Sequence, residues 1–96
     1  MSEVIEKAVT AINEKLAGDS FDGSIKIEIE DEGALIIDQN GASASDEDAD
    51  CTMTSDAETF EGILAGDVNA TSAFMSGKLR VDGDMSVAMK LGSVLS

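Results

Sequence analysis

The chain has no histidine, proline, tryptophan or tyrosine and a single cysteine among its 96 residues. Without histidine the commonest general base and zinc ligand is missing, and neither a Ser-His-Asp nor a Cys-His catalytic arrangement can form. The one cysteine, Cys51, cannot form an intramolecular disulfide, and its place in an alternating segment beside Met53 predicts a small packed residue rather than a reactive thiol. We therefore expect no enzyme activity, no metal site and no cofactor.

Basic residues are also scarce, since six Lys and Arg stand against twenty Asp and Glu and give a net charge of −14. Every charged residue between positions 27 and 77 is acidic. Recognition of phosphates needs a basic stripe, so we expect no nucleic acid partner and at most transient membrane contact. A strongly solvated surface is the simplest explanation of this charge, and adaptation to high salt is a second one.

Long apolar runs are missing as well. None approaches the roughly 18 residues that a membrane-spanning helix needs, and the first residues, Met1-Ser2-Glu3, do not resemble a signal peptide. These absences predict a cytoplasmic protein. A hydrophobic content of 43% is too high for a disordered chain, and the length fits one domain over residues 1–96.

What the chain does contain is a regular succession of apolar patterns. Apolar residues recur at helical spacing from Ile5 to Leu16, which predicts a helix over 3–17 with Ser2 as N-cap and Gly18 after its end. Residues 24–30 alternate strictly between isoleucine and polar residues, which predicts a strand with one buried face. Further strands are predicted at 34–39, 42–45, 50–54 and 78–82, and further helices at 56–65, 70–76 and 84–95.

Two local signals mark the boundaries between these elements. Asn40-Gly41 is typical of a type I′ hairpin turn. Ser55 with Glu58 three residues later fits a capping box that opens the second helix.

The resulting order, α-β-β-β-β-α-α-β-α, predicts an α+β domain. Its five-stranded sheet should be mixed but mostly antiparallel, with helices covering one face. Three strands joined without helices favour an antiparallel meander. The helical connection between strands 50–54 and 78–82 predicts that these two strands are parallel.

Large flexible apolar side chains are concentrated in the last third, at Phe74, Met75, Met85, Met89 and Leu91. Methionine suits a cavity whose ligand varies in shape. From spacing alone, however, ordinary core packing is the favoured interpretation.

The segment 73–91, AFMSGKLRVDGDMSVAMKL, closely resembles the sterol carrier protein type 2 lipid-transfer family. That family has a pattern like A-F-x-x-G-K-L/I-K/R-V/I-x-G-D/N in this place, and the G-K-L-R-V-x-G-D-M part is quite specific. The leading helix and the stretches 21–25 and 50–60 are also similar, so the resemblance covers essentially the whole chain. Many members have a proline before the A-F pair, whereas residues 67–72 contain none.

The resemblance implies an apolar tunnel between sheet and helices that takes a fatty acid, a fatty acyl-CoA, a sterol-like lipid or a phospholipid. The last helix would help to close it. On this basis the predicted lipid-binding residues are Phe60, Ile63, Leu64, Phe74, Met75, Leu79, Val81, Met85, Met89 and Leu91. Lys78 and Arg80 alternate with apolar neighbours and are expected to be ordinary exposed charges.

Two other functions stay open at this point. The same apolar groove would suit a non-catalytic regulatory module that binds a partner protein. The chain would also suit an accessory domain that delivers lipid to a separately encoded enzyme.

Overall fold

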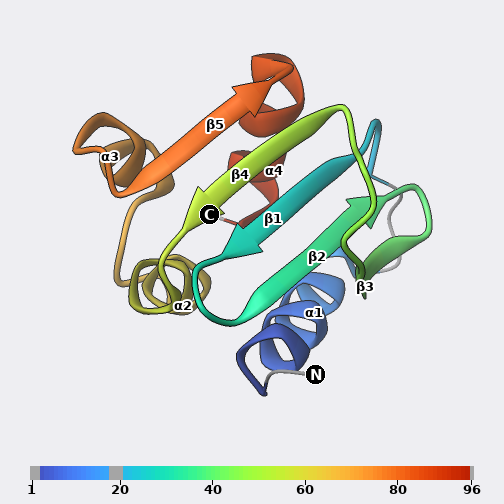
Figure 1. Cartoon of the computed structure of the whole chain (residues 1–96), viewed down its shortest axis with the longest axis horizontal. Coiled ribbons are helices and arrows are strands. Elements are labelled where there is room, and N and C mark those ends of the chain that lie inside the picture. Colours follow the sequence, from blue (N-terminus) through green and yellow to red (C-terminus); the bar gives the residue numbers. More distant parts are fainter. Residues whose placement is uncertain (1–2, 18–20, 96) are drawn as a thin grey trace.

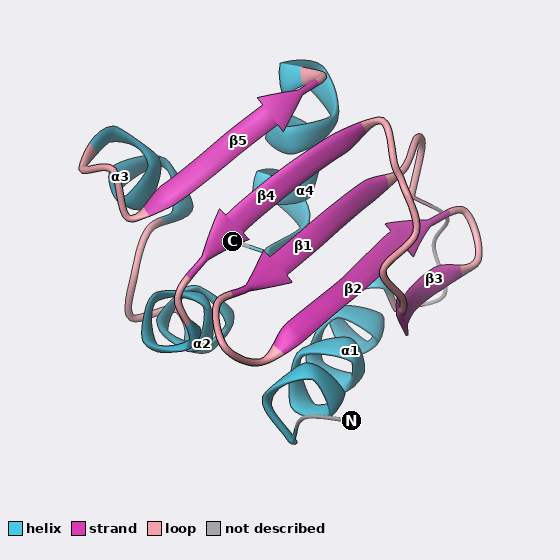
Figure 2. Cartoon of the chain, in the orientation of Figure 1, coloured by secondary structure: helices cyan, strands magenta, loops and turns pink. Residues whose placement is uncertain are grey.

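The computed structural model describes residues 3–17 and 21–95 and contains the predicted succession of elements. Figures 1 and 2 show the arrangement. The elements are α1 (Glu3–Leu16), β1 (Ile25–Ile29), β2 (Gly33–Asp38), β3 (Gly41–Ala44), β4 (Cys51–Ser55), α2 (Ala57–Ala65), α3 (Ala70–Met75), β5 (Leu79–Gly83) and α4 (Met85–Leu95). The α+β class is confirmed, while the expected cap at Ser2 and the expected end at Gly18 lie outside the described residues.

The sheet is built around β1, in the strand order β3-β2-β1-β4-β5. Every residue of β1 is paired on both sides, antiparallel to β2 and parallel to β4. Its three isoleucines, Ile25, Ile27 and Ile29, are at most 2% exposed, which confirms the alternation read from the sequence. Figure 1 shows α1, α2 and α4 behind the sheet, on the face to which these isoleucines belong.

The parallel pair is not the one predicted from the sequence. Strands β4 and β5 are antiparallel, with Ser55 opposite Leu79 and Cys51 opposite Gly83. The prediction was wrong because the chain leaves β4 and enters β5 at the same end of the sheet. The segment with α2 and α3 therefore connects the two strands as a long hairpin loop would. The chain instead makes its parallel pair when β4 enters the sheet beside β1.

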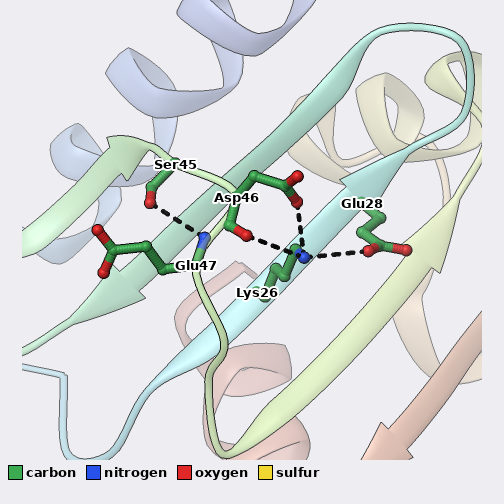
Figure 3. A network of polar contacts seen from close by, with 5 residues as sticks. All are labelled: Lys26, Glu28, Ser45, Asp46 and Glu47. Atoms are coloured by element: carbon green, nitrogen blue, oxygen red, sulfur yellow. Dashed lines mark hydrogen bonds and ion pairs between the residues drawn. The ribbon is translucent and has the colours of Figure 1, made fainter.

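Residues 45–50 make this possible by crossing the front of the sheet from β3 to β4 (Figure 3). The Lys26 ammonium contacts the Asp46 carboxylate at 2.6 Å, the Asp46 carbonyl oxygen at 3.3 Å and the Glu28 carboxylate at 3.2 Å. The hydrogen bond with Asp46 raises the pKa of Lys26. Ile36, the partner of Lys26 on β2, is only 7% exposed, so this stretch of the open sheet face is partly covered.

The turn between β2 and β3 also differs from the prediction. Asp38 pairs with Gly41, so the loop residues are Gln39 and Asn40. A type I′ turn needs positive φ at both of them, but within this turn only Gly41 has it, at 102°. The Asp38 carboxylate accepts a hydrogen bond from the Asn40 N–H at 2.8 Å and stabilises this other geometry.

The second helix begins one residue later than the capping-box prediction. Ser55 is the last residue of β4, paired with Leu79 and 1% exposed, so it is not available as a cap. Asp56 caps α2 instead, and its carboxylate accepts a hydrogen bond from the Thr59 N–H at 2.6 Å. This hydrogen bond lowers the pKa of Asp56. The predicted cap of α3 at Asn69 is confirmed.

Asn13 attaches the edge strand β3 to α1. Its amide nitrogen donates to the Ala42 carbonyl oxygen at 3.1 Å, and its amide oxygen accepts from the Ala42 N–H at 2.9 Å. These two backbone groups of β3 therefore have a side-chain partner at the edge of the sheet, which protects that edge from pairing with another chain.

We expect Asn13→Ala to lower the free energy of unfolding by about 1–3 kcal/mol, because it leaves both Ala42 groups without that partner. The measurement is urea unfolding followed by circular dichroism. Glu14→Ala, at the next and exposed position of the same helix, serves as the control and should change stability by no more than about 0.5 kcal/mol. Equal losses in the two variants would contradict the role given to Asn13.

The cap at Asp56 predicts a defined pH dependence. A carboxylate whose pKa is lowered by folding stabilises the protein above its unfolded pKa of about 3.9, and this contribution is lost as pH falls through the folded value. Asp56→Asn keeps a capping oxygen but cannot titrate. We therefore expect the wild type to exceed the variant in stability at neutral pH, and this difference to disappear in acid. A difference that stays constant in unfolding experiments from neutral to low pH would refute the assignment.

Candidate functional site

The ten predicted lipid-binding residues come from α2, α3, β5 and α4, and buried residues of all four elements belong to one apolar core cluster. Helix α3 contacts β5 and α4, and α4 also contacts β4 and β5. In Figure 1, α3 lies beside the start of β5, whereas α4 begins at the other end of β5 and runs behind the sheet. The structure thus brings together residues as distant in the chain as Phe60 and Leu91.

Six of the ten residues lie in the interior. Phe60 and Leu91 are fully buried, and Ile63 and Leu79 are 3% exposed. Leu64 and Val81 are partly buried and pack against the same core, which continues without a break into the isoleucines of β1. These six form an inner apolar group, which is defined here as Phe60, Ile63, Leu64, Leu79, Val81 and Leu91.

The other four residues lie at the surface and are called the outer apolar patch. Exposed fractions are 42% for Phe74, 80% for Met75, 46% for Met85 and 72% for Met89. Within residues 3–17 and 21–94, these four are the large apolar side chains that remain exposed. Met85 and Met89 are four residues apart and so share one face of α4.

Helix α4 packs on the rest of the molecule through one apolar face. Over residues 85–94, its buried side chains are Val87, Ala88 and Leu91, and Val94 is partly buried against the same core. Val87 and Ala88 were not among the predicted site residues, although their three- and four-residue spacing from Leu91 marks the same helical face. By contrast, α1 buries Ile5, Ala8, Ile12 and Leu16 and reaches both α2 and the sheet.

The inner apolar group offers no acid or base. The buried polar side chains in the described part of the chain are those of Ser55 and Thr59, and neither is charged. Lys78 and Arg80 are exposed, as predicted. Cys51 is 1% exposed and burial raises the pKa of its thiol, which confirms a packed residue and disfavours the reactive thiolate. The chemistry that such a region supplies is the solvation of hydrocarbon.

Two surface hollows lie elsewhere. One of about 400 Å³ is lined by residues 21–23 with Asp38 and Gln39, and one of about 370 Å³ lies along the polar side of α1. Neither contains any of the ten predicted residues. No helix in the described part of the chain is long and apolar enough to cross a bilayer.

Both glycines of the G-K-L-R-V-x-G-D segment lie where the backbone conformation favours glycine. Gly77 and Gly83 have φ of 82° and 102°, values that favour glycine. A Cβ on Gly83 would lie 2.6 Å from the Asp50 carbonyl oxygen, while one on Gly77 would meet open space. The same Asp50 oxygen accepts a hydrogen bond from the Asp84 N–H, so this part of the segment anchors the end of the crossover loop.

Comparison with known proteins agrees with this architecture. The family model described as the SCP-2 sterol transfer family matches residues 4–96. Human sterol carrier protein 2 is 47% identical over 47 residues, which are 49% of this chain but 9% of that protein, so the chain matches only a small part of this curated relative.

Solved structures share the fold at lower sequence identity. A crystal structure of sterol carrier protein 2 like 2 from Aedes aegypti has a TM-score of 0.79 at 20% identity and covers 95% of both chains. A solution structure of sterol carrier protein 2 from the same organism, in complex with the C16 fatty acid palmitate, has a TM-score of 0.78 at 20% identity and covers 100% of this chain and 97% of its own.

The two motif glycines predict different penalties. Gly77→Ala should cost about 1 kcal/mol of stability, since it adds only a side chain at positive φ. Gly83→Ala should cost about 3 kcal/mol or more, because its Cβ also overlaps the backbone of Asp50. Urea unfolding of both variants measures the difference, and equal losses would show that the contact with Asp50 does not matter.

Proposed function

The chain belongs to the SCP-2 sterol transfer family, and on that premise we propose that it binds and transfers one lipid molecule at a time. The proposed ligand is a fatty acid, fatty acyl-CoA, sterol-like lipid or phospholipid, whose hydrocarbon lies against the inner apolar group. The observation that carries the proposal is that Phe60 of α2, Leu79 of β5 and Leu91 of α4 belong to one buried apolar cluster, and that no charged side chain of the described residues is buried.

Helix α4 is the proposed gate. In the closed arrangement Leu91 is packed into the core, so an acyl chain has to separate α4 from β4 and β5 in order to enter. On α4, Val87, Ala88 and Leu91 are buried, and Val94 is partly buried against the same core. Burying a Val or Leu side chain is worth about 1.5–3 kcal/mol, so exposing Val87 and Leu91 on opening costs about 3–6 kcal/mol.

An acyl chain can replace that apolar burial. Burial of a methylene group contributes about 0.8 kcal/mol, so a chain of about sixteen carbons gains about 12 kcal/mol before the costs of ordering and entry. Micromolar binding is therefore reachable without a strong polar contact. Burying a polar headgroup without a partner costs about 2–7 kcal/mol, which places the headgroup at the protein surface. Recognition through hydrocarbon alone also favours broad specificity.

The proposal includes no catalytic step on this chain. The sequence has no histidine, and its one thiol is buried with a raised pKa. Curated relatives such as hydroxysteroid dehydrogenase-like protein 2 of Xenopus laevis are much longer, since the matched region is 11% of that protein. Delivery of lipid to an enzyme is thus a use that the same binding site would serve. The cytoplasmic location and the single-domain organisation stay predictions.

Native mass spectrometry of freshly purified protein tests the proposal directly. We expect a species heavier than the bare chain by the mass of one lipid, and added palmitate should displace it. Displacement of a fluorescent fatty acid gives the affinity. The proposal would be contradicted if the purified protein carried no lipid and bound neither palmitate nor acyl-CoA.

Two matched cavity variants locate the binding site. Leu91→Ala on α4 and Leu35→Ala on β2 both remove a fully buried leucine and should each cost about 2–5 kcal/mol of stability. An acyl chain placed against α4 should fill the space left at Leu91, because apolar cavities bind apolar ligands. We therefore expect palmitate to raise the unfolding midpoint of Leu91→Ala more than that of Leu35→Ala. Equal shifts would mean that the chain does not lie against α4.

A further inference from the structure

The two edges of the sheet, β3 and β5, differ in how their backbone groups are bonded. On β3, the N–H and carbonyl groups of Ala42 are bonded to the Asn13 side chain. On β5, no side chain of the described residues bonds to the backbone of residues 79–83, and Figure 1 shows no strand beyond it. An edge without such protection is open to pairing with another strand.

The hydrogen bonds of β4 show which backbone groups of β5 face outward. The Ser55 carbonyl oxygen accepts from the Glu30 N–H at 2.9 Å, so Ser55 and, by alternation along the strand, Met53 face β1. Met53 is the residue opposite Val81 on β5. The N–H and carbonyl groups of Val81 therefore point away from β4, to the outer side of the sheet.

Two exposed residues of opposite charge flank Val81. These are Arg80 and Asp82, and neither forms an ion pair within the described residues. Lys78, by contrast, already has the Asp56 carboxylate in its vicinity. The middle of β5 is thus basic, apolar and acidic in succession, so a second copy of the same strand in antiparallel orientation is complementary to it in charge.

Charge also selects one register for such a pair. When it is centred on Val81, the two Val81 residues exchange backbone hydrogen bonds and each Arg80 lies opposite Asp82 of the second copy. These flanking positions are the closer, non-hydrogen-bonded pairs, where opposite charges stabilise and like charges destabilise. The adjacent registers with the same hydrogen-bonding phase are centred on Arg80 or Asp82, and they place two arginines or two aspartates directly opposite each other.

The ends of β5 keep this pairing short. Helix α3 lies beside the start of the strand, where Leu79 is 3% exposed, and Gly83 ends the strand with a φ of 102°. In the register centred on Val81, Leu79 lies opposite Gly83 of the second copy, which brings no side chain to that position. The end of α3 in one copy, with Met75, then approaches the start of α4 in the other, with Met85.

We propose that the chain forms a dimer in which two β5 strands pair antiparallel about Val81. The two five-stranded sheets then form one continuous sheet with a two-fold axis. The Asn13 contact protects the outer β3 edges, so association stops at two copies. The net charge of −14 on each copy opposes association, so we expect a weak dimer at physiological salt, where the Debye length is about 8 Å. The dimer goes beyond the proposed function and does not require a bound lipid.

Sedimentation velocity at physiological salt, from about 1 μM to about 1 mM protein, tests the dimer. We expect the wild type to shift from monomer to dimer with increasing concentration. Arg80→Asp and Asp82→Arg each place like charges opposite each other at both symmetry-related positions, so each variant should self-associate about tenfold more weakly. An equimolar mixture of these two variants should pair as the wild type does, because opposite charges face each other again.

The matched control is Lys15→Glu, which changes the net charge as Arg80→Asp does but at an exposed position of α1. It should dimerise as the wild type does, and circular dichroism checks that all variants are folded. A wild type that stays monomeric over this range would overturn the inference and leave the β5 edge to a different partner. Equal weakening by the control, unchanged dimerisation of Arg80→Asp, or a mixture of the two charge variants that stays monomeric would also overturn it.

Discussion

The strict alternation of side chains along β1 is the constraint on which the rest of the structure depends. β1 is the central strand and is paired on both sides, so its alternation of apolar and polar residues determines which face of the sheet is buried. With Ile25, Ile27 and Ile29 on one face, the helices must cover that face. The opposite face is then free for a connection that contains no helix, and residues 45–50 use it to place β4 beside β1.

That crossover links the sequence motif near the C-terminus to the fold. Residue Asp50 at the end of the crossover is fixed from two directions, since its N–H donates to the Ser24 hydroxyl at 3.0 Å and its carbonyl oxygen accepts from the Asp84 N–H at 3.2 Å. Gly83 leaves room for this approach. The most specific part of the resemblance is thus explained by how β5 and α4 meet the start of β4, whether or not those residues touch a ligand.

Local features were predictable from the sequence, whereas contacts between distant segments were not. The isoleucine alternation of β1 and the Asn69 cap depend on neighbours in the chain, and both are confirmed. The pairing of β4 with β1 depends on a crossover whose direction leaves no mark in composition. The N-cap of α2 illustrates this, because the pairing of Ser55 with Leu79 makes Asp56, and not Ser55, the capping residue. For the site, apolar identity was predictable but coverage was not, so Met75 and Leu91 looked equivalent in sequence and differ by 80 percentage points in exposure.

The division between inner and outer apolar residues follows from unequal packing of two helices. Helix α1 buries Ile5, Ala8, Ile12 and Leu16 in the core and also fixes β3 through Asn13. Helix α4 buries a shorter stripe around Leu91 and leaves Met89 in solvent. A chain of this size has little apolar surface beyond what stability requires, so it cannot maintain a large empty cavity in the absence of ligand. The protein can nevertheless accept a ligand if one part of it maintains the fold and another part can repack. Helix α1 with β1–β3 is the first part. In the second part, α3, β5 and α4 retain flexible side chains that can pack against one another or against a lipid.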